Sequence, residues 1–148
     1  MSTAKRITAL VLVLSLAACA RATSGPEYST EYSLSQASDS VPLVMGRETH
    51  VGTLWLTLTG VPEDSRCATD VVCVWAGDAV AEITADPPCY RDGCLMPSAQ
   101  FQLHTTLEPK SGDYAGFRVT LVRITPYPVS TQRIEQRDYV AWIRLTAN

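Results

Sequence analysis

The sequence lacks the motifs of several common enzyme classes and contains only two histidines, His50 and His104, in 148 residues. It has no Gly-x-Ser-x-Gly elbow, no His-Glu-x-x-His pair, no P-loop and no Gly-x-Gly-x-x-Gly turn. A Ser-His-Asp site would need one of these two histidines, and each lies in or beside an expected strand, where a surface position is the simpler interpretation. We therefore predict a protein that is not an enzyme, with no catalytic residue and no cofactor.

Metal-binding cysteine pairs and clusters of basic residues are also lacking. Neither Cys67 and Cys73 nor Cys89 and Cys94 have the Cys-x-x-Cys spacing typical of structural zinc, so no metal site is expected. Without residues 1–18 the chain has ten basic and fifteen acidic side chains, a formal charge of −5. This balance argues against nucleic acid as a partner and against a polybasic attachment to anionic lipid.

The chain has one long run of apolar and small residues, at positions 7–18, and a cysteine follows it directly. The run is too short to span a bilayer, which takes about 20 apolar residues. Because Lys5 and Arg6 precede it, the pattern is typical of a secretory signal. An ordinary secretory signal would need no cysteine at its end, and Cys19 would then be a coincidence.

The four residues Leu16-Ala17-Ala18-Cys19 resemble the lipobox of bacterial lipoproteins. The resemblance implies diacylglycerol on the Cys19 sulfur, cleavage after residue 18, and an envelope protein held by membrane lipid. Two or three acyl chains, at about 0.8 kcal/mol per buried CH₂, would make release negligible. Ala20 is not the Asp that retains lipoproteins in the inner membrane, so the resemblance implies an outer-membrane protein facing the periplasm in a two-membrane bacterium.

Five cysteines are an odd number for an exported protein. If Cys19 carries lipid, an even set remains for an oxidising compartment: Cys67, Cys73, Cys89 and Cys94. Four cysteines allow three pairings, and we predict the two local bridges, Cys67–Cys73 and Cys89–Cys94. Each bridge would close a short loop.

The remaining sequence predicts a tether followed by one all-β domain. Residues 1–18 are the expected signal peptide, 19–40 the lipidated cysteine and a flexible Ser- and Thr-rich tether, and 41–148 the domain. About seven short strands, separated by Gly, Pro and Asp, favour an antiparallel β-sandwich over the alternative of a small barrel. The strands are expected at residues 41–45, 54–59, 72–84 with a break or bulge at Gly77, 99–105, 117–125 and 139–145. Trp75 is predicted to be a core anchor on a central strand.

Two loops contain candidate binding residues. Glu63, Asp64 and Arg66 lie close together in the sequence and could bind a cation or polar ligand. The favoured interpretation is structural: Asp64 bonds to loop amides and Arg66 pairs with a carboxylate. The second loop has Tyr90 and Arg91 between two cysteines.

The stretch EDSRC, five further residues and CVWAG resemble a recurring domain of uncharacterised bacterial exported and lipid-anchored proteins. The later stretches LEPKSGDYAGFRVTLVRITPYP and RDYVAWIRL resemble the same domain. This chain departs from it in having Ala68 where proline is usual and in the loop around Cys89 and Cys94. The family brings no known activity.

These features together predict a membrane-anchored bacterial lipoprotein whose domain is a non-catalytic binding or interaction module. Its partner would be an envelope protein or a small ligand. One alternative is an inhibitor of a secreted or periplasmic hydrolase, in which the rigid loop with Tyr90 and Arg91 at its tip plugs an active site. A second alternative is a hydrolase.

Overall fold

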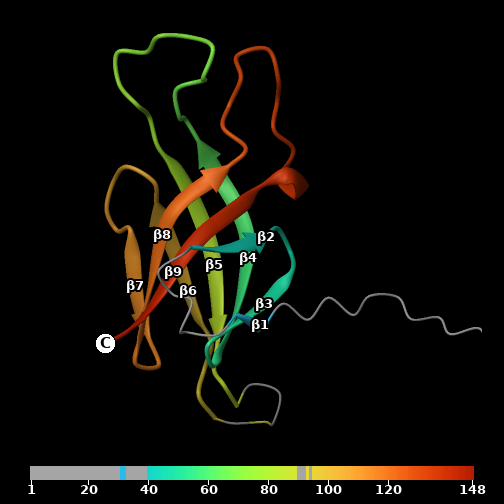
Figure 1. The fold of residues 1–148 in the computed structure, drawn as a ribbon, viewed down its shortest axis with the longest axis vertical. Coiled ribbons are helices and arrows are strands. Elements are labelled where there is room, and N and C mark those ends of the chain that lie inside the picture. Colours follow the sequence, from blue (N-terminus) through green and yellow to red (C-terminus); the bar gives the residue numbers. More distant parts are fainter. Residues whose placement is uncertain (1–30, 33–39, 90–92, 94) are drawn as a thin grey trace, which may run out of the picture.

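The computed structural model describes residues 31–32, 40–89, 93 and 95–148. Two sheets lie face to face as a β-sandwich, with strand order β1-β3-β4-β5-β6 in one sheet and β2-β9-β8-β7 in the other (Figure 1). All pairs are antiparallel except β1 with β3. The elements are β1 (Glu31–Tyr32), β2 (Val41–Val44), β3 (Glu48–Val51), β4 (Leu54–Asp64), β5 (Ala79–Asp86), β6 (Ala99–His104), β7 (Ser111–Tyr114), β8 (Phe117–Thr125), the 3₁₀-helix η3 (Gln136–Asp138) and β9 (Val140–Ala147). The predicted all-β sandwich is confirmed, and the sheets do not close into a barrel.

The core lies between the sheets and follows from alternation along the strands. In β4 the three leucines, Leu54, Leu56 and Leu58, are fully buried, whereas Trp55 and Thr57 between them are only partly buried. The corresponding positions of β9 and β8 face them from the other sheet, and the buried residues there are Ala141, Ile143, Leu145, Val119, Leu121 and Ile124. Burying one such side chain contributes about 1.5–3 kcal/mol. The strands predicted at residues 54–59, 117–125 and 139–145 correspond to β4, β8 and β9.

The strand predicted at residues 72–84 is wrong in its first half. β5 begins only at Ala79, and residues 65–78 form a loop at one end of the sandwich (Figure 1). Trp75 is not a core anchor, because 83% of its surface is exposed. The disulfide Cys67–Cys73 closes a ring within this segment, so the apolar residues around it cannot continue the β5 ladder.

Several predictions fall on residues outside the described part of the chain. They include the signal peptide at 1–18, Cys19, Tyr90, Arg91 and Cys94, and with Cys94 the bridge Cys89–Cys94. Of the tether, only Glu31–Tyr32 is described as an element, and these two residues pair in parallel with β3. No helix among the described residues has the length and apolar character needed to cross a membrane.

Candidate functional site

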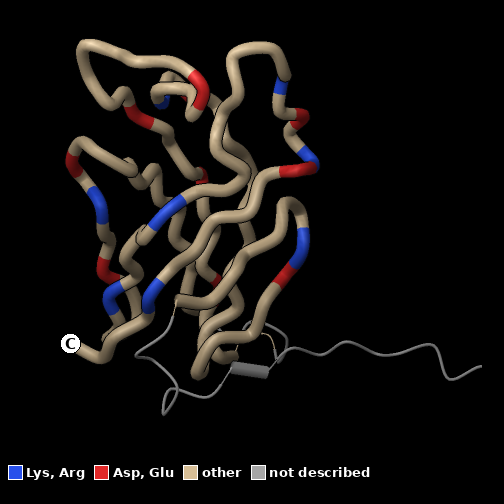
Figure 2. Tube along the Cα trace, turned by 45° about the horizontal axis from the view of Figure 1, so that its top comes forward, with Lys and Arg blue, Asp and Glu red and all other residues tan. Residues whose placement is uncertain are grey.

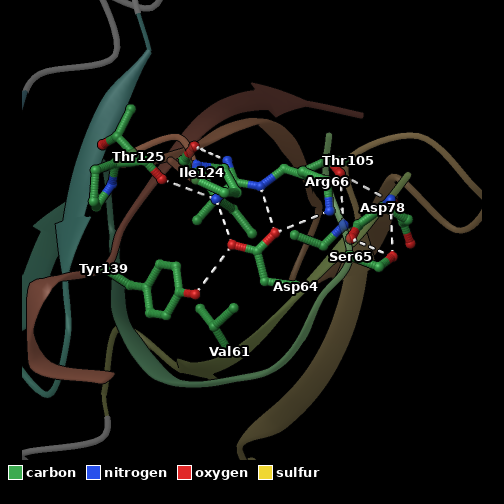
Figure 3. A network of polar contacts seen from close by, with 12 residues as sticks. Val61, Asp64, Ser65, Arg66, Asp78, Thr105, Ile124, Thr125 and Tyr139 are labelled. Atoms are coloured by element: carbon green, nitrogen blue, oxygen red, sulfur yellow. Dashed lines mark hydrogen bonds and ion pairs between the residues drawn. The ribbon is translucent and has the colours of Figure 1, made fainter. Parts of the chain in front are cut away.

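Asp64 and Arg66 form a buried ion pair at the end of β4 (Figure 3). The Arg66 Nε donates to Asp64 Oδ1 at 2.8 Å and Nη2 donates to Oδ2 at 2.6 Å, a two-pronged pairing. Only 4% of the Arg66 side chain and 9% of the Asp64 side chain are exposed. The predicted pairing of Arg66 with a carboxylate, and of Asp64 with a loop amide, the Arg66 N–H at 3.3 Å, is confirmed.

The same guanidinium also reaches the end of β8 and the segment that follows it. Nη1 donates to the carbonyl of Ile124, and Nη2 donates to the carbonyl of Pro126 at 2.9 Å. The Tyr127 ring lies against the guanidinium carbon, 4.7 Å from the ring centre. Because every nitrogen of Arg66 is engaged, this residue serves to join two loops and is not free to bind a ligand.

Tyr139 completes the network around Asp64. Its hydroxyl donates to Asp64 Oδ2 at 3.0 Å. Burial alone would raise the pKa of Asp64, but the hydrogen bonds and charge of Arg66 outweigh it and lower that pKa. Burial and the neighbouring carboxylate raise the pKa of Tyr139 to about 12. Asp64 is therefore charged and Tyr139 neutral at pH 7. Glu63 is exposed and takes no part in these contacts.

A second polar cluster fixes the other end of the loop, where β5 begins. Asp78 Oδ2 lies 2.6 Å from His104 Nδ1, and Asp78 Oδ1 accepts from the Thr105 hydroxyl at 2.9 Å and the Thr106 N–H at 2.7 Å. Burial opposes ionisation, but these bonds lower the pKa of Asp78 to about 2. Ser65 N–H donates to the Asp78 carbonyl at 2.7 Å, so both ends of the loop are joined.

The loop itself, residues 65–78, is held in one shape by covalent and backbone contacts. The Cys67–Cys73 bridge spans six residues, and closing so short a loop stabilises by about 2 kcal/mol. Cys67 N–H donates to the Ala76 carbonyl at 2.8 Å. Gly77 has φ +70° and passes so near Ser65 that a Cβ at this position would lie 1.9 Å from the Ser65 carbonyl oxygen. Only glycine fits there.

The loop that follows β8 contacts loop 65–78 and helps to hold it in place. Thr69 N–H donates to the Pro128 carbonyl at 2.9 Å. Asp70 Oδ1 accepts from the Ser130 N–H at 2.8 Å, and the Ser130 hydroxyl bonds to Asp70 Oδ2. These bonds from Ser130 lower the pKa of Asp70. The two loops, which lie side by side at one end of the sandwich in Figure 1, therefore form one surface.

This surface carries large apolar side chains in water. Val72 and Val74 are fully exposed, Trp75 is 83% exposed, and Val71 and Tyr127 are about half exposed. Clustered exposed apolar side chains are a common feature of binding surfaces, and tryptophan is among the residue types most enriched in those that dominate binding energy. Sequence reasoning took Val72–Trp75 for core because an apolar run is the usual signal of burial. The close spacing of Cys67 and Cys73 was the sequence feature that argued against a strand at residues 72–78.

The two histidines are each held by a neighbour. The ring of His50 lies against Trp55, with 4.5 Å between ring centres, and His104 bonds to Asp78. Within the residues that the structure describes, no group of three or more His, Cys, Asp or Glu is arranged to hold a metal ion.

No family model, no curated protein and no solved structure matches this chain.

Proposed function

We propose that the protein is a lipid-anchored bacterial envelope lipoprotein whose β-sandwich is a non-catalytic module that binds a partner protein through loop 65–78. The observation that carries the proposal is the exposure of Val72, Val74 and Trp75 on a loop fixed by a disulfide and by the adjacent loop. A fixed loop loses little conformational entropy on docking, so most of its contact energy contributes to affinity.

A protein partner suits this surface better than a lipid surface. Residues 67–77 contain one charged residue, Asp70, and no Lys or Arg. Basic residues are dispersed over the described part of the chain and do not gather beside the loop (Figure 2). Interfacial membrane segments usually combine apolar groups with basic ones. The loop also lies at the end of the sandwich opposite β1, the described element nearest in sequence to Cys19 (Figure 1).

Replacing Trp75 with Ala is expected to weaken partner binding by about 30-fold or more without unfolding the domain. The side chain makes few intramolecular contacts, so the free energy of unfolding should change by about 0.5 kcal/mol or less. Loss of a central interface tryptophan costs about 2 kcal/mol or more, which is about 30-fold in Kd. The measurement is capture from an envelope extract by immobilised domain, identification of the captured protein, and titration of that purified protein against both variants.

Leu95→Ala is the matched control, because Leu95 is fully exposed but lies in the β5–β6 connection at the opposite end of the sandwich. It should leave the Kd unchanged. Equal capture by wild type and Trp75→Ala would contradict the proposal, as would binding of the domain to lipid vesicles that Trp75→Ala removes.

The inhibitor alternative predicted from the sequence used the loop with Tyr90 and Arg91, which lies outside the described residues. Loop 65–78 is a different surface that could plug a hydrolase. A disulfide-closed loop with exposed apolar side chains suits that role, since its shape is set before docking. Loss of the captured protein's hydrolytic activity on adding the domain would favour inhibition over simple assembly.

Cys19→Ser is expected to block lipid attachment and leave uncleaved precursor in the native host. The reason is chemical: a serine hydroxyl cannot replace the thiolate that forms the thioether. Mass spectrometry of the protein from membranes tests this. A processed, soluble Cys19→Ser protein, or an unmodified thiol in the wild type, would contradict the anchoring proposal.

A further inference from the structure

An open groove of about 690 Å³ lies across the outer face of β4, β5 and β6, outside the core. It is formed by side chains that the strand register places in rows. Gly60, Glu82 and Gln102 are aligned in one row, and Thr84 and Gln100 are aligned in the next. The residues that line the groove include Thr59, Glu82, Thr84, Gln100, Gln102 and His104.

The position of the Glu82 carboxylate depends on a missing side chain in the neighbouring strand. A Cβ at Gly60 would lie 2.8 Å from Glu82 Oε2, so the carboxylate occupies space that glycine leaves open on β4. Gln102 Nε2 donates to Glu82 Oε1 at 3.1 Å. Glu82 is thus held across the middle of the groove, and His104 at its end is held by Asp78.

The lining determines which class of ligand fits. The two glutamine amides, the threonine hydroxyls and the carboxylate offer donors and acceptors side by side, and Pro109 adds an apolar contact. Ile83 and Phe101 also border the groove, but strand alternation turns their side chains toward the core. Among the described residues that line the groove there is no Lys or Arg, and Glu82 would repel an anion, so phosphate groups and acidic sugars do not match it. A neutral ligand whose hydroxyl groups both donate and accept, with small apolar CH groups that can lie against Pro109, does match it.

We infer that this groove binds a neutral oligosaccharide. An extended peptide adding to the sheet would run parallel to β6 at its free edge. The groove instead crosses three strands from β6 to β4, a distance of about 10 Å at the usual strand spacing. Its volume lies within the range of ordinary ligand sites. This site meets loop 65–78 only in the contact of His104 with Asp78, at the end of the loop, and does not depend on the function proposed for that loop.

The test uses cellohexaose and chitohexaose as probes of the ¹⁵N-labelled domain, residues 20–148, by nuclear magnetic resonance. At least one probe should bind with a Kd of about 1 mM or tighter and shift the side-chain amide signals of Gln100 and Gln102. Gln102→Ala and Glu82→Gln should each weaken binding about 10-fold while the rest of the spectrum stays folded. Gln132→Ala, which removes an exposed glutamine from another loop, and Trp75→Ala should leave the Kd unchanged.

The inference would be overturned if neither saccharide shifts any groove signal at about 10 mM, ten times that Kd. It would also be overturned if Gln102→Ala and Glu82→Gln bind as well as wild type, or if the shifts cluster at loop 65–78. Failure of the Trp75→Ala capture experiment would leave this result unaffected, so the two proposals are tested separately.

Discussion

Replacing Arg66 with Met is expected to lower the free energy of unfolding by about 3–5 kcal/mol. The change leaves the Asp64 carboxylate buried without its counter-ion and removes the donors that satisfy the carbonyls of Ile124 and Pro126. Removing one partner of a buried pair costs more than the pair itself contributes, because the remaining charge has lost both water and its partner. Urea denaturation followed by tryptophan fluorescence measures the loss.

Arg118→Met is the matched control. Arg118 makes the same two-pronged contact to Asp113, at 2.8 and 2.9 Å, but both side chains are about half exposed. Water replaces the lost partner there, so the destabilisation should be much smaller. The double variant Asp64→Leu/Arg66→Met should recover part of the loss from Arg66→Met, since no unpaired charge remains. If Arg66→Met and Arg118→Met lower the free energy of unfolding by the same amount, burial of the Asp64–Arg66 ion pair has no effect on stability.

Replacing Gly77 with Ala is expected to destabilise the domain by about 3 kcal/mol or more. Two costs combine at this position. The backbone has φ +70°, which a residue with a Cβ adopts at a cost of about 1–2 kcal/mol. The added methyl would also overlap the Ser65 carbonyl oxygen at 1.9 Å, and backbone on both sides must move to relieve it. Thermal and urea unfolding give the change in stability.

Gly116→Ala separates the two costs. Gly116 has φ +81° in the β7–β8 turn, but no heavy atom lies within 4 Å of the position that a Cβ would take. Gly116→Ala should lower the free energy of unfolding by about 1–2 kcal/mol, the cost of the backbone conformation alone. If Gly77→Ala costs no more than Gly116→Ala, the close approach of residue 77 to Ser65 does not constrain the loop as inferred.

The fold could be predicted where a single physical signal dominated. Alternation at Leu54, Leu56 and Leu58 has one explanation, a strand with one face in the core, and β4 begins where it was expected. Its end was predicted wrongly, because the strand continues past residue 59 to Asp64. The pairing of Arg66 with a carboxylate was also predictable, because Asp64 is two residues away and such contacts are local.

The exposed apolar residues of loop 65–78 and the long-range contacts of Arg66 and Asp78 could not be predicted from the sequence. Val72, Val74 and Trp75 have the composition of a core strand, and no local rule says that a ring closed by Cys67 and Cys73 will hold them in water. The carbonyl partner of Arg66 at Ile124 is 58 residues away, and His104 is 26 residues from Asp78. Contacts of this kind depend on strand register and loop placement, which the pattern of a single segment does not contain.

The hydrogen bonds between Asp70 and Ser130 bear on how the proposed binding module could acquire a new partner. The two residues are 60 positions apart, yet they fix two loops into one composite surface. Substitutions in the loop that follows β8 would change the orientation of loop 65–78 without any change in the sequence of loop 65–78. Substitutions in either loop could thus change which partner the proposed surface binds, while the β-sandwich that carries both loops stays the same.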